Sequence, residues 1–231
     1  MASTGATGRP GRPDLSGAEE QKRNAAEAAA ALIEDGMRVG LGTGSTVAYL
    51  LPAIARRGLR GLRCAATSPA TERDATALGL LVEPLDDLGV LDIAIDGADQ
   101  VDPQGWLIKG GGGAHTREKI VATAARRFVA IVSADKAVEA LSPPVPLELL
   151  AFGVEHTLEL LAPAQLRDAP PSPDGNLIAD YTGPVDDPAE LAARLEATPG
   201  LVGHGLFEPE LVSLVVIGED GGVRTRAGAK A

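Results

Sequence analysis

Four consecutive glycines, residues 110–113, lie between Lys109 and the start of a predicted helix that carries Glu118. Each glycine loses more backbone entropy on folding than other residues do, and it offers no side chain for packing. The run therefore predicts a place where backbone amides come close to a ligand, with Lys109 supplying positive charge. Beside such a loop, Glu118 is a candidate general base for taking a proton next to a carbonyl group. A purely structural carboxylate in the first helical turn is the alternative.

Three further polar clusters share this setting, because each directly follows an apolar segment typical of a strand. They are GTGST at 42–46, DGAD at 96–99 and SADK at 133–136. Together with KGGGG at 109–113, all four are expected just past the carboxyl ends of strands. In an open parallel sheet these ends share one edge, where ligands bind. The four clusters are therefore predicted to form a single site.

The GTGST turn opens a predicted helix, so its amides and the helix dipole could hold an anion. Thr43, Ser45 and Thr46 add hydroxyl donors. The turn is not a dinucleotide fingerprint, because Ser45 stands at the third glycine position, and it is not a Walker A loop, because no Gly-Lys-Ser/Thr occurs. A plain strand-to-helix turn is the other interpretation.

A metal site is a weaker interpretation of the acidic cluster. Asp96, Asp99 and Asp102 could be ligands, but the calcium-loop spacing is absent and no His or Cys lies nearby in the sequence. Acid–base or hydroxyl-binding roles suit Asp96 and Asp99 better, and we expect neither a metal nor a cofactor. His115, at the junction of the glycines and the helix, is either catalytic or a solvent-facing residue.

The elements that must position these residues alternate along the first part of the chain. Apolar strand-like segments with helices between them predict an α/β fold with a doubly wound, mainly parallel sheet. A first helix ends before Gly36, and a capping box at Ser16 and Glu19 begins it. Strands are expected at 37–42, 62–67, 80–85, 91–96, 106–109 and 128–134, and helices at about 45–57, 69–78 and 115–126.

The pattern changes at residues 141–150, where three prolines predict a linker. After it we expect a smaller α+β domain with a helix through about Leu161, a strand at 176–181, and a helix capped by Asp187. Strands at 201–207 and 211–218 follow. The predicted domains are a disordered tail at 1–15, a main domain at 16–142 plus 214–231, and the small domain at 143–213.

Composition excludes several classes of partner. The net charge is −11 with no basic stripe, which disfavours nucleic acid and anionic membranes. No apolar run is long enough to span a membrane and no signal sequence opens the chain. The lone cysteine, Cys64, agrees with a reducing compartment. A cytoplasmic location is expected.

The ordered set of motifs resembles type A ribose-5-phosphate isomerases. The segments that carry the resemblance are GLGTGST, DGAD, KGGGGAHTREK, PVPLELLAFG, LEATPGLVGHGLF and GEDGGVRT, between about Glu20 and Arg226. The resemblance implies a Rossmann-like domain with a smaller α+β domain, and assembly as a homodimer or homotetramer. It implies interconversion of D-ribose 5-phosphate and D-ribulose 5-phosphate in the pentose phosphate pathway, without metal.

Residue by residue, the resemblance implies that Glu118 transfers the proton and that Lys22 lies near the substrate phosphate. The pattern departs at Gln100, where an acid is usual, and at Ser133, where an aspartate is common. The implied substrate contacts are Thr43, Gly44, Ser45, Thr46, Asp96, Gly97, Ala98, Asp99, Lys109, Gly110, Gly111, Gly112 and Lys136.

The expected reaction moves one proton between C2 and C1 through an enediolate. Lys109 and the amides of 110–113 would stabilise the enediolate oxygens. Asp96 would open the sugar ring, Asp99 would hold hydroxyls, and the GTGST turn with Lys136 would anchor the phosphate.

Two rival functions stay open at this point. One is an enzyme acting on another phosphosugar, such as an amino-sugar phosphate deaminase or a phosphogluconolactonase. The other is a sugar-phosphate sensor, which would require an attached DNA-binding helix-turn-helix and a missing base.

Overall fold

A six-stranded sheet forms the larger part of the molecule, of which the computed structural model describes residues 17–230. Its strands are β1 (Arg38–Leu41), β2 (Arg63–Ala66), β3 (Leu91–Gly97), β6 (Ala125–Ser133), β12 (Leu214–Glu219) and β13 (Gly222–Ala227). The order is β13-β12-β6-β3-β1-β2. All neighbours are parallel except β12 and β13, which form an antiparallel hairpin at one edge.

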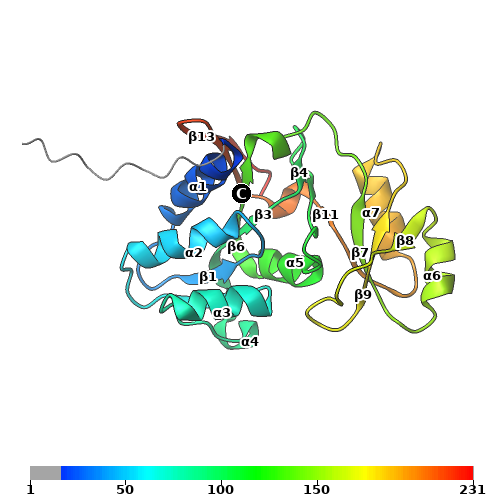
Figure 1. Ribbon diagram of the computed structural model, residues 1–231, viewed down its shortest axis with the longest axis horizontal. Coiled ribbons are helices and arrows are strands. Elements are labelled where there is room, and N and C mark those ends of the chain that lie inside the picture. Colours follow the sequence, from blue (N-terminus) through cyan, green and yellow to red (C-terminus); the bar gives the residue numbers. More distant parts are fainter. Residues whose placement is uncertain (1–16, 231) are drawn as a thin grey trace, which may run out of the picture.

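Helices cover both faces of this sheet (Figure 1). They are α1 (Gly17–Ala30), α2 (Val47–Arg56), α3 (Pro69–Ala77), α4 (Leu85–Leu88) and α5 (His115–Ala124). Helices α1 and α2 pack on the face that carries Ile93 and Ile95, and α5 packs on the face that carries Ala94 and Phe128. This arrangement confirms the predicted doubly wound α/β fold.

A second, antiparallel sheet of four strands has the order β10-β7-β9-β8. Its elements are β7 (Val145–Leu149), α6 (Val154–Leu160), β8 (Ala164–Leu166), β9 (Leu177–Tyr181), α7 (Pro188–Glu196) and β10 (Leu201–His204). Asp187 caps α7 as predicted, since its carboxylate accepts from the amides of Ala189 and Glu190. The separate smaller sheet agrees with the expected α+β part.

A third, three-stranded sheet lies between the other two in Figure 1. It consists of β4 (Gln100–Val101), β5 (Leu107–Ile108) and β11 (Leu206–Phe207), all antiparallel. Two 3₁₀ turns, η1 (Ala134–Lys136) and η2 (Pro209–Leu211), complete the described elements.

Several predicted elements are wrong. The segment read as a linker contains β7, a buried strand in the interior of the four-stranded sheet. Pro146 is tolerated in β7 because it lies one residue beyond Leu147, which makes the last pair with β10. Its carbonyl accepts from the amide of Gly205, and the Gly205 carbonyl accepts from Lys109, so no hydrogen bond of the sheet requires an N–H from Pro146. The segment at 80–85 is not a strand: Val82 makes a single bridge to Cys64, and α4 follows.

Other boundaries differ because pairing partners, not local pattern, set them. The strand at 106–109 lies outside the parallel sheet, and the segment 201–207 divides at Gly205 into β10 and β11, which belong to different sheets. The sequence analysis did not predict β4, β8 or β13. The tail at 1–15 and the Ser16 cap lie outside the described residues. Within those residues, no helix has the length and apolar character needed to cross a membrane.

Candidate active site

A cavity of about 320 Å³ opens where the loops after β1, β3 and β6 meet the glycine loop. Because β2 and β3 lie on opposite sides of β1, this is the point where the strand order reverses, and such points bind ligands in open α/β sheets. The lining residues are Lys22, Thr43, Gly44, Ser45, Thr46, Gly97, Ala98, Asp99, Lys109, Gly110, Gly111, Gly112, Glu118, Ser133 and Lys136. The structure thus brings together all the predicted site residues except Asp96.

The glycine loop does not follow a strand of the parallel sheet, contrary to the prediction from the sequence. Three of the four polar clusters follow strands of the parallel sheet, but KGGGG follows β5 of the three-stranded sheet. The glycine loop therefore approaches the cavity from a different sheet. Its position depends on contacts between sheets and not on a shared sheet edge.

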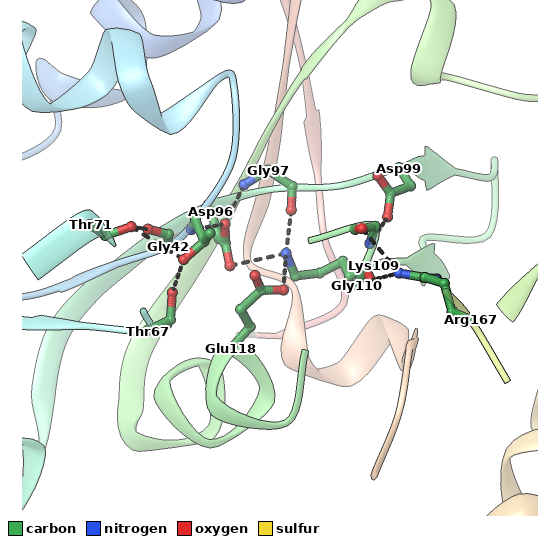
Figure 2. A network of polar contacts seen from close by, with 12 residues as sticks. Gly42, Thr67, Thr71, Asp96, Gly97, Asp99, Lys109, Gly110, Glu118 and Arg167 are labelled. Carbon is green, nitrogen blue, oxygen red and sulfur yellow. Dashed lines mark hydrogen bonds and ion pairs between the residues drawn. The ribbon is translucent and has the colours of Figure 1, made fainter. Parts of the chain in front are cut away.

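Lys109 lies between two buried carboxylates (Figure 2). Its Nζ is 3.0 Å from Oδ2 of Asp96 and 3.0 Å from Oε2 of Glu118, and it also donates to the carbonyl oxygen of Gly97. The three side chains are at most 5% exposed. Nζ is 5.4 Å from the centre of the Phe207 ring, which packs against the ammonium. The three contacts leave the ammonium fixed between the two acids.

The charges in this group do not balance, since one ammonium faces two carboxylates. Burial and the neighbouring charge of Asp96 raise the pKa of Glu118 to about 7, although Lys109 opposes the shift. Burial also raises the pKa of Asp96. Burial by itself would lower the pKa of Lys109, but Asp96 and Glu118 outweigh it and raise that pKa. A carboxyl group with a pKa near neutrality can both accept and return a proton.

Asp96 lies beneath Lys109 and is not among the residues that line the cavity. Its Oδ1 accepts from the amide of Thr43 at 3.0 Å and from that of Gly97 at 2.7 Å. Asp99, by contrast, is on the cavity wall, and its Oδ2 accepts from the amide of Gly111 at 2.8 Å. The two aspartates of DGAD therefore have different positions relative to any ligand.

The glycine loop makes a turn that other residues rarely adopt. Gly110 has a φ of +104°, and a Cβ there would lie 2.6 Å from Nδ1 of His115. His115 is fully buried beneath this turn, so the solvent-facing interpretation of His115 is wrong. Burial lowers its pKa to about 4, which leaves the imidazole neutral. His115 therefore packs against the loop without adding charge to the cavity.

The cavity is also lined by the hydroxyl residues of the GTGST turn and by two lysines, Lys22 and Lys136. The hydroxyl of Thr43 is hydrogen-bonded to those of Thr67 at 2.7 Å and Thr71 at 3.2 Å, which fixes the GTGST turn. Lys22 Nζ is 2.7 Å from Oε1 of Glu19. Hydroxyl and ammonium groups of this kind can bind an anion.

The two departures from the expected pattern have separate explanations. Ser133 lines the cavity and donates to the carboxylate of Asp135, so an acid is present two residues later. Gln100 does not line the cavity: its amide exchanges two 2.8 Å hydrogen bonds with the backbone of Ser142. Gln100 therefore links two loops.

Three contributors were missed by the sequence analysis. Arg167 donates to the carbonyl oxygens of Gly110 and Gly111, and Phe207 packs against Lys109. Gly205 accepts from the amide of Lys109 at 2.8 Å and donates to the carbonyl of Pro146 at 2.7 Å. All three are far from the glycine loop in sequence, and no local spacing points to them. In residues 17–230, no group of three or more His, Cys, Asp or Glu side chains is placed to hold a metal ion.

The cavity lies at the switch point of a doubly wound sheet, and a buried carboxylate and an ammonium face each other there. Such a fold and site are typical of α/β enzymes that act on small molecules. More specifically, the chain belongs to the ribose 5-phosphate isomerase A (phosphoriboisomerase A) family, whose model matches residues 63–222. This membership confirms the resemblance drawn from the motifs.

Individual relatives agree over nearly the whole chain. Ribose-5-phosphate isomerase A of Caulobacter vibrioides is 45% identical over 221 residues, covering 89% of this chain and 97% of the relative. A solved D-ribose-5-phosphate isomerase in complex with phospho-erythronic acid has 34% identity and a TM-score of 0.86, covering 91% and 99% of the two chains. The structure of the Neisseria gonorrhoeae ribose 5-phosphate isomerase A has 30% identity and a TM-score of 0.87, covering 91% and 97%.

Proposed function

We propose that this chain interconverts D-ribose 5-phosphate and D-ribulose 5-phosphate, with Glu118 as the base. The observation that carries the proposal is the Glu118 carboxylate beside the Lys109 ammonium in a cavity that Lys22, Lys136 and the GTGST turn also line. The names of the relatives support the choice of substrate.

Glu118 takes the proton from C2 of the open-chain aldose and returns it to C1. In the enediolate the hydroxyl proton passes from O2 to O1, which leaves the carbonyl at C2 and gives the ketose. One base on one face of the substrate is sufficient, because the same carboxylic acid returns the proton that it received. The raised pKa of Glu118 suits both steps, since neither protonation state is strongly favoured near neutral pH.

Negative charge develops on the O1 and O2 oxygens of the enediolate. We propose that the Lys109 ammonium, through its charge, and the amides of the glycine loop, as hydrogen-bond donors, stabilise these oxygens. Their positions are fixed before substrate arrives, and such preorganised donors usually supply the largest part of transition-state stabilisation. The bare backbone of residues 110–112 allows the substrate to approach closely.

Ring opening requires a group that exchanges a proton with the sugar. The sequence favoured Asp96, but Asp96 lies behind Lys109 and Asp99 lines the cavity. We therefore propose that Asp99 contacts the sugar hydroxyl during ring opening, while Asp96 holds Lys109 in place.

The GTGST turn, Lys136 and Lys22 anchor the phosphate in this proposal. Binding energy from the phosphate then positions the reacting carbons beside Glu118. A solved relative is in complex with phospho-erythronic acid, a phosphorylated sugar acid, which supports a phosphorylated ligand for this chain.

A coupled assay of purified protein tests the activity, with ribose 5-phosphate compared against an amino-sugar phosphate and a phosphogluconolactone. Turnover of ribose 5-phosphate alone is expected. Preferred turnover of another phosphosugar would favour the related enzymes, and binding without turnover would favour a sensor.

We further propose that the protein acts in the cytoplasm, in the pentose phosphate pathway, as a homodimer or homotetramer. The division into domains at 142/143 and 213/214 is also a proposal, which the membership of β12 and β13 in the six-stranded sheet supports. Light scattering after gel filtration measures the oligomeric state, and a monomer at micromolar concentration would contradict the assembly.

A further inference from the structure

We propose that Arg167, which directly follows β8 of the four-stranded sheet, is a positioning residue for the isomerase reaction. It sets the direction of one peptide group in the glycine loop and thereby holds Asp99. This inference rests on the proposed function, because it concerns the same cavity.

The guanidinium of Arg167 forms hydrogen bonds to the glycine loop on one side and to Asp180 on the other. Its Nη1 donates to the carbonyl oxygen of Gly110 at 3.2 Å and to that of Gly111 at 3.0 Å. Its Nε and Nη2 bind the two carboxylate oxygens of Asp180 on β9, at 2.9 and 2.5 Å. The Arg167 side chain is 21% exposed and that of Asp180 is 18% exposed. A planar fork held in this way has one orientation, which a lysine could not reproduce.

The peptide group between Gly110 and Gly111 joins Arg167 to Asp99. Its carbonyl accepts from Arg167, and its N–H donates to Oδ2 of Asp99 at 2.8 Å. Figure 2 shows Arg167 and Asp99 in contact with this segment of the loop. Because a hydrogen-bonded chain polarises its members, the guanidinium strengthens the N–H as a donor to the carboxylate.

This peptide group needs an external restraint because glycines lie on both sides of it. Glycine adopts positive and negative φ with similar ease, so a peptide between two glycines can rotate with little steric resistance. In the rotated form a carbonyl oxygen, instead of an N–H, would face the Asp99 carboxylate. It would also turn partial negative charge toward the position proposed for the enediolate. The Arg167 hydrogen bond to the Gly110 carbonyl opposes that rotation, together with the amide of Gly113, which donates to the same carbonyl at 3.0 Å. The second Arg167 bond holds the next peptide group through the Gly111 carbonyl.

Arg167 is not among the residues that line the cavity. Arg167 therefore acts indirectly, through the glycine-loop backbone and through the interaction of its charge with Asp99. Removing it should impair the chemical step more than substrate binding. The phosphate-binding end, with the GTGST turn and Lys136, receives no contact from Arg167 in the described residues.

The test compares Arg167→Ala and Arg167→Lys with the matched control Arg63→Ala. Arg63 makes the same type of two-bond pair, with Glu83 at 2.8 and 2.8 Å, and also donates to a backbone carbonyl, but it lies outside the cavity. For Arg167→Ala we expect kcat to fall about 10- to 100-fold, the scale for losing a hydrogen bond to a charged group. KM for ribose 5-phosphate should stay within about threefold. Arg63→Ala should leave both constants within about twofold.

A double-mutant cycle with Asp99→Asn tests the route of the effect. If Arg167 acts through Asp99, the double variant should be about as slow as Asp99→Asn alone, because interacting residues are not additive. Independent, multiplying effects would overturn the proposal, as would an Arg167→Ala or Arg167→Lys protein with wild-type kcat. Should Arg167→Ala not fold, Arg167→Lys, which keeps the charge but loses the fork, carries the test. A wild-type protein inactive on ribose 5-phosphate would instead refute the proposed function.

Discussion

The Lys109 ammonium lies 3.0 Å from the Glu118 carboxylate while a second carboxylate, that of Asp96, lies 3.0 Å from the same nitrogen. One buried ammonium is thus ion-paired with two carboxylates. Burial and the negative charge of Asp96 together raise the pKa of Glu118 despite the adjacent cation. The proton affinity of the proposed base therefore depends on a residue that does not line the cavity.

Replacing Glu118 by Gln removes the proposed base and keeps the shape of the side chain. We expect kcat to fall by at least about 10²-fold, the usual scale of lost acid–base catalysis, with little change in KM. Steady-state kinetics on ribose 5-phosphate measure both constants. Glu159→Gln, on the exposed side of α6, is the control and should behave as wild type. A Glu118→Gln enzyme with near wild-type turnover would remove Glu118 from this role.

The rate should depend on a single ionisation near neutral pH. Glu118 must be deprotonated to act, and its pKa is raised to about 7, so kcat/KM should rise as pH increases through that value. Asp96→Asn removes the neighbouring negative charge and should move this rise to lower pH. A pH–rate profile of both proteins decides the matter, and an unchanged midpoint in the variant would contradict the electrostatic explanation.

The same shift should make the protein less stable at the pH where it is more active. The folded state binds the Glu118 proton more tightly than the unfolded state, whose pKa is near 4.5. The stabilisation is complete below 4.5 and is lost as pH rises through about 7. Urea titrations at pH 5 and pH 8 give the unfolding free energies of wild type and Glu118→Gln. Relative to the variant, wild type should be less stable at pH 8 than at pH 5. A pH-independent difference would show that Glu118 titrates normally.

Removing Lys109 should leave two buried acids without a counter-charge. We expect Lys109→Met to abolish measurable turnover and to lower the unfolding free energy by about 3–5 kcal/mol at neutral pH, as for other broken buried ion pairs. The double variant Lys109→Met/Asp96→Asn should recover part of the stability and none of the activity. Denaturant unfolding and the coupled assay measure the two effects. A double variant no more stable than Lys109→Met would mean that Asp96 is not destabilised by losing its partner.

The proposed phosphate end predicts a different kinetic signature. Lys136→Ala should raise KM for ribose 5-phosphate about 10- to 100-fold, the scale of one hydrogen bond between charged groups. The effect on kcat should be smaller. Arg224→Ala removes one exposed positive charge outside the cavity and controls for net charge. Equal changes in both variants would argue against a specific contact from Lys136.

Much of the cavity could be predicted because its parts are local in sequence. The clusters at 42–46, 96–99 and 133–136 lie at or just after the carboxyl ends of β1, β3 and β6, and these ends of a parallel sheet meet at one edge. Apolar runs and turn residues mark those strands without knowledge of their partners. The doubly wound fold follows from the same alternation.

The remainder depends on contacts between distant segments. The two-residue strand β5 is too short to reveal its antiparallel partners, so the glycine loop was placed at the wrong sheet. Prolines at 143, 144 and 146 obscured the buried strand β7. The position of Asp96 behind Lys109, and the reach of Arg167 across two sheets, have no signature in spacing.

Gly205 connects the small sheet to the chain segment that carries the proposed catalytic ammonium, through hydrogen bonds to Pro146 and Lys109. A Cβ at this position would lie 2.1 Å from the carbonyl oxygen of Lys109. Even alanine would therefore push apart two strands whose separation determines where Nζ stands. Gly205, almost a hundred positions from Lys109 in the sequence, thus helps to determine where the Lys109 ammonium lies.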